Sequence, residues 1–149
     1  MDIVRYGIIG LGNMGTGHMG YFQKGEVPGA KVTAICDIRQ DRIDRMVGKY
    51  PDAGFKTYLS YKDLVDGGEV DAVIVAVPHY FHPEIVIYAL KKGLNVICEK
   101  PAGVYTKQVK KMMEVAKTAK GLFTMMFNQR TNCLYRKMRE IILDRKSVV

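Results

Sequence analysis

The amino-acid sequence predicts an α/β fold, in which helices cover both faces of a doubly wound parallel sheet. Three observations favour this fold. Short apolar runs rich in β-branched residues alternate with amphipathic segments along the chain. The first apolar run ends in a cluster of glycines. The 149 residues, of which 48% are hydrophobic and 26% charged, suit a single domain with a hydrophobic core.

The first half of the chain predicts three strands, each followed by a helix. The run from Val4 to Ile9 is short and apolar and stops at glycines, as a buried parallel strand does. The second helix has Ile43, Met46 and Val47 on one face. The expected strands are residues 4–9, 31–36 and 55–58, and the expected helices are residues 14–24, 39–50 and 61–66.

The second half continues the alternation with three more strands and three more helices. Pro78 ends the fourth strand, Gly93 closes the fourth helix, and Thr106 can cap the fifth helix, which ends at Gly121. The expected strands are residues 72–77, 95–98 and 122–127. The expected helices are residues 83–92 and 106–121, and a last amphipathic one with Leu134, Met138, Ile141 and Ile142 on its apolar face.

Parallel strands need long crossover connections, and each predicted helix supplies one of them. The alternation therefore predicts a three-layer α-β-α arrangement of the Rossmann type. Val109, Met112, Met113 and Ala116 share one face of the fifth helix, which we expect to pack on the sheet.

A glycine motif lies between the first predicted strand and the first predicted helix. It has the pattern G-x-G-x-x-G and consists of Gly10, Leu11, Gly12, Asn13, Met14 and Gly15. The first glycine permits a tight turn, the second lets the backbone approach a pyrophosphate, and the third lets helix and strand pack closely. The helix N-terminus adds free N–H donors. The pattern alone is weak, but this position favours a dinucleotide-binding site.

Asp37 lies 22 residues beyond Gly15, at the end of the second predicted strand. A carboxylate there can accept hydrogen bonds from both hydroxyls of an adenosine ribose. Its charge would repel a 2′-phosphate, which favours NAD over NADP. Arg39 and Arg42 leave NADP possible, because either guanidinium could bind that phosphate. Both arginines could equally be solvent-exposed charges at the start of a helix.

The tripeptide Glu99-Lys100-Pro101 follows the fifth predicted strand directly. With the glycine motif and Asp37, it makes the sequence resemble the Gfo/Idh/MocA family, the group of glucose-fructose oxidoreductase and inositol dehydrogenase. The resemblance extends over essentially the whole chain. It includes two further segments, Pro-His-Tyr-Phe-His at residues 78–82 and Asn-Gln-Arg at residues 128–130.

The resemblance implies hydride transfer between NAD(P) and the hydroxyl-bearing carbon of a sugar, a polyol or a related metabolite. In the family, the lysine of the E-K-P motif lies beside the nicotinamide and the substrate, which implies a catalytic role for Lys100 and places Glu99 on the cofactor side. A lysine at the carboxyl end of a strand in such a sheet points into the ligand crevice, where it can polarise a substrate hydroxyl or exchange a proton with it. The alternative is a solvated lysine before a turn proline.

Residues 78–82 resemble a family pattern of Pro, Asn and, after two further residues, His, which contacts the nicotinamide side of the cofactor. Pro78 and His82 match this pattern, whereas His79 stands where Asn is usual. The resemblance therefore implies cofactor contacts for all three, with the contact of His79 left open. The two histidines could instead bracket the start of the next helix. We expect no metal site, because a third ligand is lacking.

Asn128 and Arg130 resemble family positions on the substrate side, although a salt bridge that fixes the next helix is an alternative for Arg130. The dinucleotide-binding domain is expected over residues 1–130. Residues 131–149 are expected to form a helix that leads toward a substrate domain absent from this sequence. In the family, that domain supplies an Asp and a His near the substrate and the interface of a homo-oligomer. His18, inside the first predicted helix, is not a candidate for that acid/base role.

The net charge is unusual, because 23 Lys and Arg against 15 Asp and Glu give +8 and an isoelectric point of about 9.4. Such a charge favours anionic partners. The basic residues are scattered, however, and many of them fall on the polar side of the fifth predicted helix. We therefore expect a solvated surface and a small-molecule substrate, with no nucleic-acid partner.

Cysteine content and hydropathy bear on the compartment. Three widely spaced cysteines favour neither a disulfide framework nor a zinc site, and no apolar stretch approaches the roughly 18 residues of a membrane span. The N-terminus lacks the features of a secretory signal. A cytoplasmic protein without a membrane partner is expected.

Besides an oxidoreductase, the sequence allows a non-catalytic dinucleotide-binding module, such as a sensor or a partner subunit.

Overall fold

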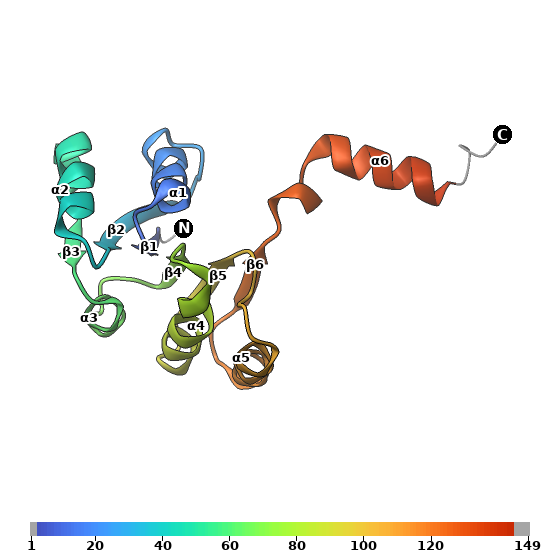
Figure 1. Ribbon diagram of the computed structural model, residues 1–149. Helices are drawn as coiled ribbons and strands as arrows, with labels where there is room; N and C mark the ends of the chain where they lie inside the picture. The colour runs from blue at the N-terminus through green and yellow to red at the C-terminus, as the bar shows by residue number, and fades with distance from the viewer. Residues whose placement is uncertain (1–2, 145–149) are drawn as a thin grey trace.

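The computed structural model describes residues 3–144 and confirms the doubly wound α/β fold (Figure 1). Six parallel strands form one sheet in the order β3-β2-β1-β4-β5-β6. Between β1 and β4 the strand order reverses, which makes this the topological switch point of the sheet. The strands are β1 (Val4–Ile9), β2 (Ala30–Cys36), β3 (Lys56–Tyr58), β4 (Ala72–Val75), β5 (Asn95–Glu99) and β6 (Phe123–Met126).

Helices cover both faces of this sheet. In Figure 1, α1 and α2 lie above the sheet, whereas α3, α4 and α5 lie below it. The helices are α1 (Asn13–Gln23), α2 (Gln40–Lys49), α3 (Tyr61–Asp66), α4 (His82–Lys91), α5 (Thr106–Thr118) and α6 (Cys133–Leu143). Three short 3₁₀ turns accompany them, namely η1 (Pro51–Ala53), η2 (His79–Phe81) and η3 (Asn128–Arg130).

The two faces of the sheet carry separate hydrophobic cores. Successive side chains of a strand point to opposite faces, so Ile8 packs with Met19 and Met46 beneath α1 and α2, while Ile9 belongs to the core of α3, α4 and α5. Val86 of α4 is completely buried in that second core. Each such side chain contributes about 1.5–3 kcal/mol through burial. The near-continuous apolar runs in the central strands thus reflect burial on both faces.

Several element ends differ from the sequence prediction by a few residues. Strand β4 ends at Val75, two residues early, and the 3₁₀ turn η2 then leads into α4. Helix α5 ends at Thr118, because Ala119 has an extended backbone with φ −68° and ψ 148°. The capping prediction for Thr106 is wrong. Tyr105 is the N-cap residue and makes no side-chain capping bond, so Thr106 is the first residue of the helix.

Two expected apolar faces are more exposed than the periodicity indicates. On α2, Ile43 and Met46 are buried, but Val47 is 40% exposed. On α5, Met112 is completely buried and Met113 is 44% exposed. Helical periodicity predicts the centre of an apolar stripe well. The burial of residues at the margin of the stripe also depends on how far the neighbouring sheet extends.

Helix α6 projects away from the sheet (Figure 1). The predicted apolar positions Leu134, Met138, Ile141 and Ile142 are all exposed. The helix begins with a conventional cap, because the side chain of Asn132 accepts a hydrogen bond from the backbone N–H of Leu134 at 3.0 Å. Across residues 3–144, no helix combines the length and hydropathy needed to cross a membrane.

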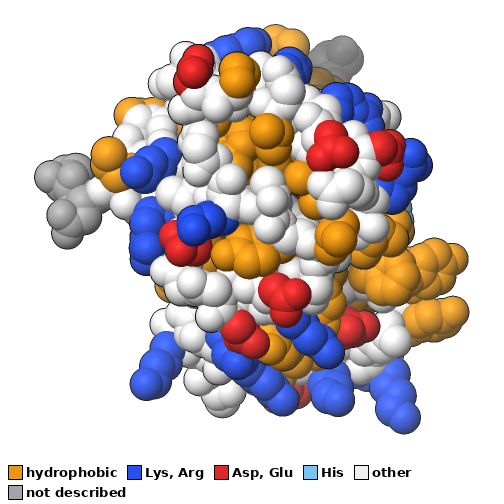
Figure 2. All heavy atoms as spheres, turned by 90° about the vertical axis from the view of Figure 1, so that its left-hand side faces the viewer, with side chains coloured by type: hydrophobic (Ala, Val, Ile, Leu, Met, Phe, Trp, Pro, Cys, Tyr) orange, Lys and Arg blue, Asp and Glu red, His pale blue; other side chains and the backbone are white. Residues whose placement is uncertain are grey.

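Figure 2 views the side of the molecule that carries α2 and β3. Lysine and arginine side chains on this face stand among aspartates and glutamates, around a centre of hydrophobic side chains. Independently of this view, ion pairs join oppositely charged neighbours among the described residues, such as Lys92 with Asp66 and Arg39 with Asp41, each at 2.7 Å. The basic residues on this face therefore do not form one continuous patch.

Candidate functional site

A groove of about 770 Å³ lies at the carboxyl ends of β1, β2 and β4, at the switch point of the sheet. We call it the switch-point groove. In an open α/β sheet this is where ligands bind. The structure brings seven of the predicted cofactor residues to its walls, namely Gly10, Gly12, Asn13, Met14, Asp37, Arg39 and Pro78. The other predicted residues lie outside its lining and are described below.

The glycine turn forms the floor of the switch-point groove. Gly10 has φ +96°, and a Cβ atom there would lie 2.5 Å from the carbonyl oxygen of Ala76 in the loop after β4. A Cβ atom on Gly15 would collide with the carbonyl oxygen of Gly10. A Cβ atom on Gly12, in contrast, would meet nothing and would project into open space. The first and third glycines thus serve the fold, and the second keeps the groove free.

Helix α1 presents unpaired donors to the groove. Gly12 is its N-cap residue and provides no capping side chain. The first backbone N–H groups of a helix have no partner within the helix, and the helix dipole adds partial positive charge at this end. An anionic group such as a pyrophosphate fits here, because it can accept these hydrogen bonds.

Asp37 is 4% exposed and stands at the end of β2. Its Oδ2 atom accepts hydrogen bonds from the backbone N–H of Leu11 at 2.8 Å and from the guanidinium of Arg42 at 3.1 Å. Its Oδ1 atom accepts one from the backbone N–H of Arg39 at 3.0 Å. The carboxylate is therefore fixed in position, and its negative charge is balanced on one side by Arg42.

The two arginines near Asp37 have different partners. The guanidinium of Arg39 binds Asp41 through two hydrogen bonds of 2.7 and 2.9 Å, which hold the pKa of Asp41 below its usual value. Arg42 instead pairs with Asp37. The sequence left open which arginine governs the charge at the ribose position, and the structure assigns the closer contact to Arg42.

Several residues of the groove wall escaped the sequence analysis. Ile38 is 86% exposed and lines the groove next to Asp37 in the sequence, and Phe81 also lines it. Tyr61 and Glu84 also line it, and the phenol of Tyr61 donates a 2.6 Å hydrogen bond to Glu84. Burial raises the pKa of Tyr61, so the phenol stays protonated. An apolar residue in the exposed position after Asp37 was the one signal that could have indicated this wall.

Cys36 also lines the groove, but its chemistry is not that of a nucleophile. Burial, with a smaller effect from the charge of Asp37, raises the pKa of its thiol to about 12. A thiol in this state carries almost no thiolate at neutral pH and reacts slowly.

The predicted residues of the loop after β4 divide between surface and interior. His79 is exposed, and its ring centre lies 5.6 Å from that of His82. His82 is completely buried, and both of its ring nitrogens contact backbone carbonyl oxygens, Nδ1 to Pro101 at 2.8 Å and Nε2 to Val77 at 2.9 Å. Its ring thus links the loop after β4 to the loop after β5.

Lys100 is exposed immediately after β5, and its peptide bond to Pro101 is cis. Glu99 is 4% exposed, and its carboxylate lies 2.8 Å from Nε2 of His18 on α1. It also accepts the backbone N–H of Lys100 at 3.2 Å. Strand β5 pairs with β4 in parallel, so Lys100 stands at the same edge of the sheet as the switch-point groove. The contact between His18 and Glu99 was not predicted from the sequence.

Asn128 and Arg130 are exposed in η3, beyond the end of β6. The guanidinium of Arg130 lies 4.8 Å from the ring centre of Phe127, and within residues 3–144 it forms no salt bridge. Arg130 lines a separate hollow of about 760 Å³ with residues of α6, such as Tyr135 and Arg139. These two predicted residues therefore belong to another region than the switch-point groove.

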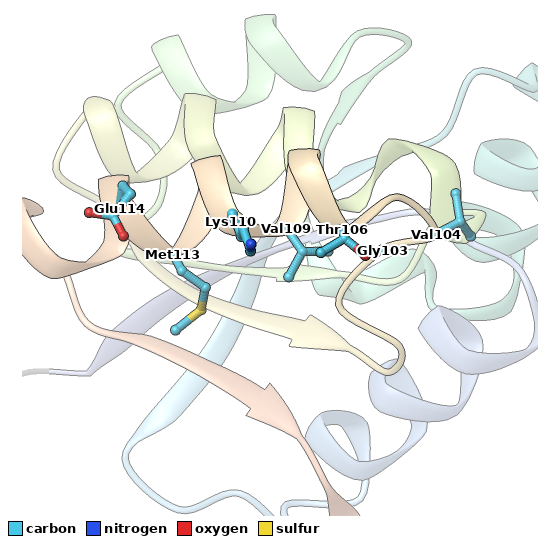
Figure 3. A pocket seen from close by; sticks show the side chains of 7 residues that line it. All are labelled: Gly103, Val104, Thr106, Val109, Lys110, Met113 and Glu114. Atoms are coloured by element: carbon cyan, nitrogen blue, oxygen red, sulfur yellow. The ribbon is translucent and has the colours of Figure 1, made fainter.

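A further pocket, of about 290 Å³, lies along α5 (Figure 3). Its lining comes from that helix and from the loop before it, with Gly103 and Val104 at one end and Met113 and Glu114 at the other. It contains none of the predicted site residues. Neither its size nor its lining matches a dinucleotide, in contrast to the switch-point groove.

Known proteins with similar sequences include several inositol dehydrogenases. A family described as "Oxidoreductase family, NAD-binding Rossmann fold" matches residues 4–127. The chain is 33% identical over 139 residues to myo-inositol 2-dehydrogenase of Thermotoga maritima, covering 93% of this chain and 40% of that protein. It is 32% identical over 121 residues to the rhizopine catabolism protein MocA of Rhizobium meliloti, covering 80% of this chain and 36% of that protein.

Solved structures give the same result. Myo-inositol 2-dehydrogenase of Lactobacillus plantarum superposes with a TM-score of 0.88 at 33% identity, covering 96% of this chain and 42% of that one. Scyllo-inositol dehydrogenase of Lactobacillus casei, with bound NAD(H) and scyllo-inositol, superposes with a TM-score of 0.87 at 25% identity and the same coverage. The chain thus spans about 40% of the length of the relatives it matches. It belongs to the Gfo/Idh/MocA family of oxidoreductases with an NAD-binding Rossmann fold.

Proposed function

We propose that this chain is the cofactor-binding part of an oxidoreductase that transfers a hydride between NAD and the hydroxyl-bearing carbon of a polyol or sugar. Relatives named inositol dehydrogenases support this substrate class. The switch-point groove supports the cofactor, because it combines an uncapped helix N-terminus with a fixed carboxylate at the end of β2. When bound, NAD would supply the hydride acceptor, and the residues of this chain would hold and orient it.

The observation that carries this proposal is the geometry of Gly12 and Asp37. The open space at Gly12 fits a pyrophosphate against the first N–H groups of α1. Asp37 lines the same groove, where its carboxylate can accept hydrogen bonds from the hydroxyls of the adenosine ribose. The exposed side chain of Ile38 and the ring of Phe81 provide apolar walls for an adenine.

Lys100 is proposed to act on the substrate. Its exposed ammonium group stands at the carboxyl edge of β5, next to the strand pair that bounds the groove. There it can donate a hydrogen bond to the hydroxyl that becomes a carbonyl, or exchange a proton with it. Asn128 and Arg130, further along the same edge after β6, are proposed to face the substrate side.

NAD is proposed over NADP as the cofactor. Asp37 already accepts three hydrogen bonds, and its carboxylate would repel a 2′-phosphate at the ribose. Arg42 offsets part of this charge but is bound to Asp37 itself. The guanidinium of Arg39 is held by Asp41 through two hydrogen bonds. Neither arginine is therefore free for a phosphate without losing a charged partner.

Calorimetric titration of the chain with NADH and with NADPH tests the cofactor assignment. NADH is expected to bind more tightly, and Asp37→Ala is expected to narrow the difference by about 1.5–3 kcal/mol, the range of a charged hydrogen bond. Asp44→Ala is the matched control, because it removes a carboxylate of α2 whose one hydrogen bond within residues 3–144 is accepted from Gln40. A wild-type preference for NADPH would reverse the assignment, and absence of binding by both would exclude a dinucleotide site.

The role of residues 131–149 also remains a proposal. Helix α6 is proposed to lead toward a substrate domain that completes the crevice, and residues 145–149 of this segment lie outside the described residues. A homo-oligomer of the whole protein stays a prediction from the resemblance. All three cysteines are free in the structure, which supports a reducing compartment, and we propose the cytoplasm.

A further inference from the structure

Two buried polar side chains remain without a role in the cofactor groove. Among residues 3–144, the buried polar or charged side chains are Asp37, His82 and Glu99. Asp37 belongs to the switch-point groove. Glu99 immediately precedes Lys100, and His82 contacts the residue that follows it. Burying such groups is costly unless each finds a specific partner, so their arrangement calls for an explanation.

The first of these contacts links α1 to the peptide before Lys100. One oxygen of the Glu99 carboxylate lies 2.8 Å from Nε2 of His18, and the other accepts the backbone N–H of Lys100 at 3.2 Å. The side chains of His18 and Glu99 are only 11% and 5% exposed. The same helix presents its N-terminus to the groove. The element that would hold the pyrophosphate is thus connected to the backbone of Lys100 by two hydrogen bonds.

The second contact links α4 to the peptide after Lys100. His82 lies between the carbonyl oxygens of Val77 and Pro101, at 2.9 and 2.8 Å. Both carbonyl oxygens are acceptors within hydrogen-bond distance of the ring, so the nitrogen that carries the proton donates to one of them. His82 therefore ties the carboxyl-end loops of β4 and β5 together.

We propose that His18 and His82 are positioning residues, which fix the backbone on either side of Lys100 and thereby its ammonium group relative to the nicotinamide crevice. His18 acts through Glu99, and His82 acts through the Pro101 carbonyl. Lys100 itself is exposed, and among residues 3–144 its ammonium group has no hydrogen-bond or ion-pair partner, whereas its backbone N–H bonds to Glu99. Such a side chain needs its support from the peptide that carries it. A misplacement of about 1 Å is enough to cost a reaction about 10²-fold.

This inference rests on the proposed function, and its test measures whether the Lys100 ammonium group lies close to the nicotinamide ring. The nicotinamide ring is positively charged in NAD⁺ and neutral in NADH, so a nearby ammonium group weakens the binding of NAD⁺ relative to that of NADH. The measured quantity is the ratio of the dissociation constants of NAD⁺ and NADH for the purified chain. Lys100→Ala is expected to lower this ratio about tenfold.

His18→Ala and His82→Ala are each expected to lower the ratio by about threefold or more, because the ammonium group is no longer held beside the ring. Neither substitution is expected to change the ratio further when Lys100 is already alanine. His18→Gln keeps a hydrogen-bond donor for Glu99, so its ratio is expected to stay close to that of the wild type. If His82→Ala does not fold, the two His18 variants decide the question.

Asn95→Ala is the matched control on the opposite end of β5. Its side chain donates a hydrogen bond to the carbonyl oxygen of Asp71 at 3.0 Å and accepts one from the backbone N–H of Leu122 at 2.9 Å. Loss of this side chain therefore lowers the stability of the protein but removes no contact of Lys100. The melting temperature should fall while the ratio stays unchanged. A merely structural role for the histidines predicts the same behaviour for His18→Ala.

The outcomes separate the two proposals. Absence of dinucleotide binding by the wild-type chain contradicts the proposed function. Binding with an unchanged ratio in Lys100→Ala, or an effect of His18→Ala that persists unchanged in the Lys100→Ala background, overturns the positioning role while leaving cofactor binding intact. A lowered ratio that depends on Lys100 and is rescued by His18→Gln supports it.

Discussion

At the scale of single residues, the three glycines of the first turn do different work. Gly10 and Gly15 are required by the backbone, because a Cβ atom on either would strike a carbonyl oxygen. Gly12 meets no such obstacle, has an ordinary extended conformation with φ −76°, and opens onto the groove. Folding and binding therefore place separate demands on neighbouring positions of one motif.

Gly12→Ala is predicted to weaken NADH binding by about tenfold or more, because the added methyl group occupies the pyrophosphate position. Its effect on stability should be small, about 1 kcal/mol or less, since only the helix cap changes. Gly17→Ala is the matched control. It lies on the same helix, where a Cβ atom also meets nothing, so NADH affinity should not change. Equal affinity for the wild type and Gly12→Ala would refute the assigned pyrophosphate site.

The sequence was informative for these residues because their chemistry is local. The glycine spacing and Asp37 after a strand can be recognised without any tertiary contact, and both lie on the groove. The partners of Glu99 and His82 could not be predicted, because His18 is 81 residues away from Glu99 and Pro101 is 19 residues away from His82. Hydrogen bonds of that range depend on how helices dock on the sheet.

At the scale of elements, strand and helix types were predicted more reliably than their ends. The six strands and six helices all appear in the predicted order, whereas β4 and α5 end two or three residues early. Contacts remote in sequence also join the elements, and the sequence does not show them. One of these joins β1 to the residue before β4, where Arg5 binds Asp71 through its guanidinium at 2.7 Å and through its backbone N–H at 2.9 Å.

Asp71→Asn is predicted to lower the unfolding temperature at neutral pH by a few degrees, because this central strand pair loses an ion pair. Arg5 holds the pKa of Asp71 below its usual value of 3.8. A carboxyl group with a lowered folded-state pKa stabilises the protein above its unfolded-state pKa, and this stabilisation is lost as the pH falls through the folded-state pKa. The difference between wild type and variant should therefore shrink as the pH is lowered from 7 to 3.

Thermal unfolding followed by circular dichroism measures this dependence. Asp52→Asn serves as control, since Asp52 lies in η1 and forms no ion pair in the part of the chain from residue 3 to 144. A difference for Asp71→Asn that stays constant with pH would show that the Arg5 contact does not depend on the carboxylate charge.

At the scale of the whole molecule, the sheet order explains why residues far apart in sequence share one edge. The carboxyl ends of β1, β2 and β4 bound the switch-point groove, and β5 adds Lys100 to the same edge. The alternation of strands and helices was enough to predict this architecture. The parts of the wall formed by Tyr61 and Phe81 were not predictable, because these residues become neighbours of Ile38 only when the loops meet in space.

The chain alone is predicted to bind NAD while turning over essentially no substrate. Its relatives are more than twice as long, and the proposed substrate wall lies outside residues 3–144. Fixing hydride donor and acceptor in reacting geometry contributes about 7–11 kcal/mol, and a general acid or base adds about 10²–10⁴-fold. The assay is NADH formation from NAD⁺ with a panel of inositols, other polyols and aldoses. Rates of about 1–10³ s⁻¹ would place a complete active site within this chain.

The most direct test of the central claim is a crystal structure of the chain with NADH. The account predicts density for the adenosine ribose against the Asp37 carboxylate, for the pyrophosphate at Gly12 and the start of α1, and for the nicotinamide on the side of Lys100. Density for the dinucleotide in the hollow beside α6 or along α5, with the switch-point groove empty, would contradict it.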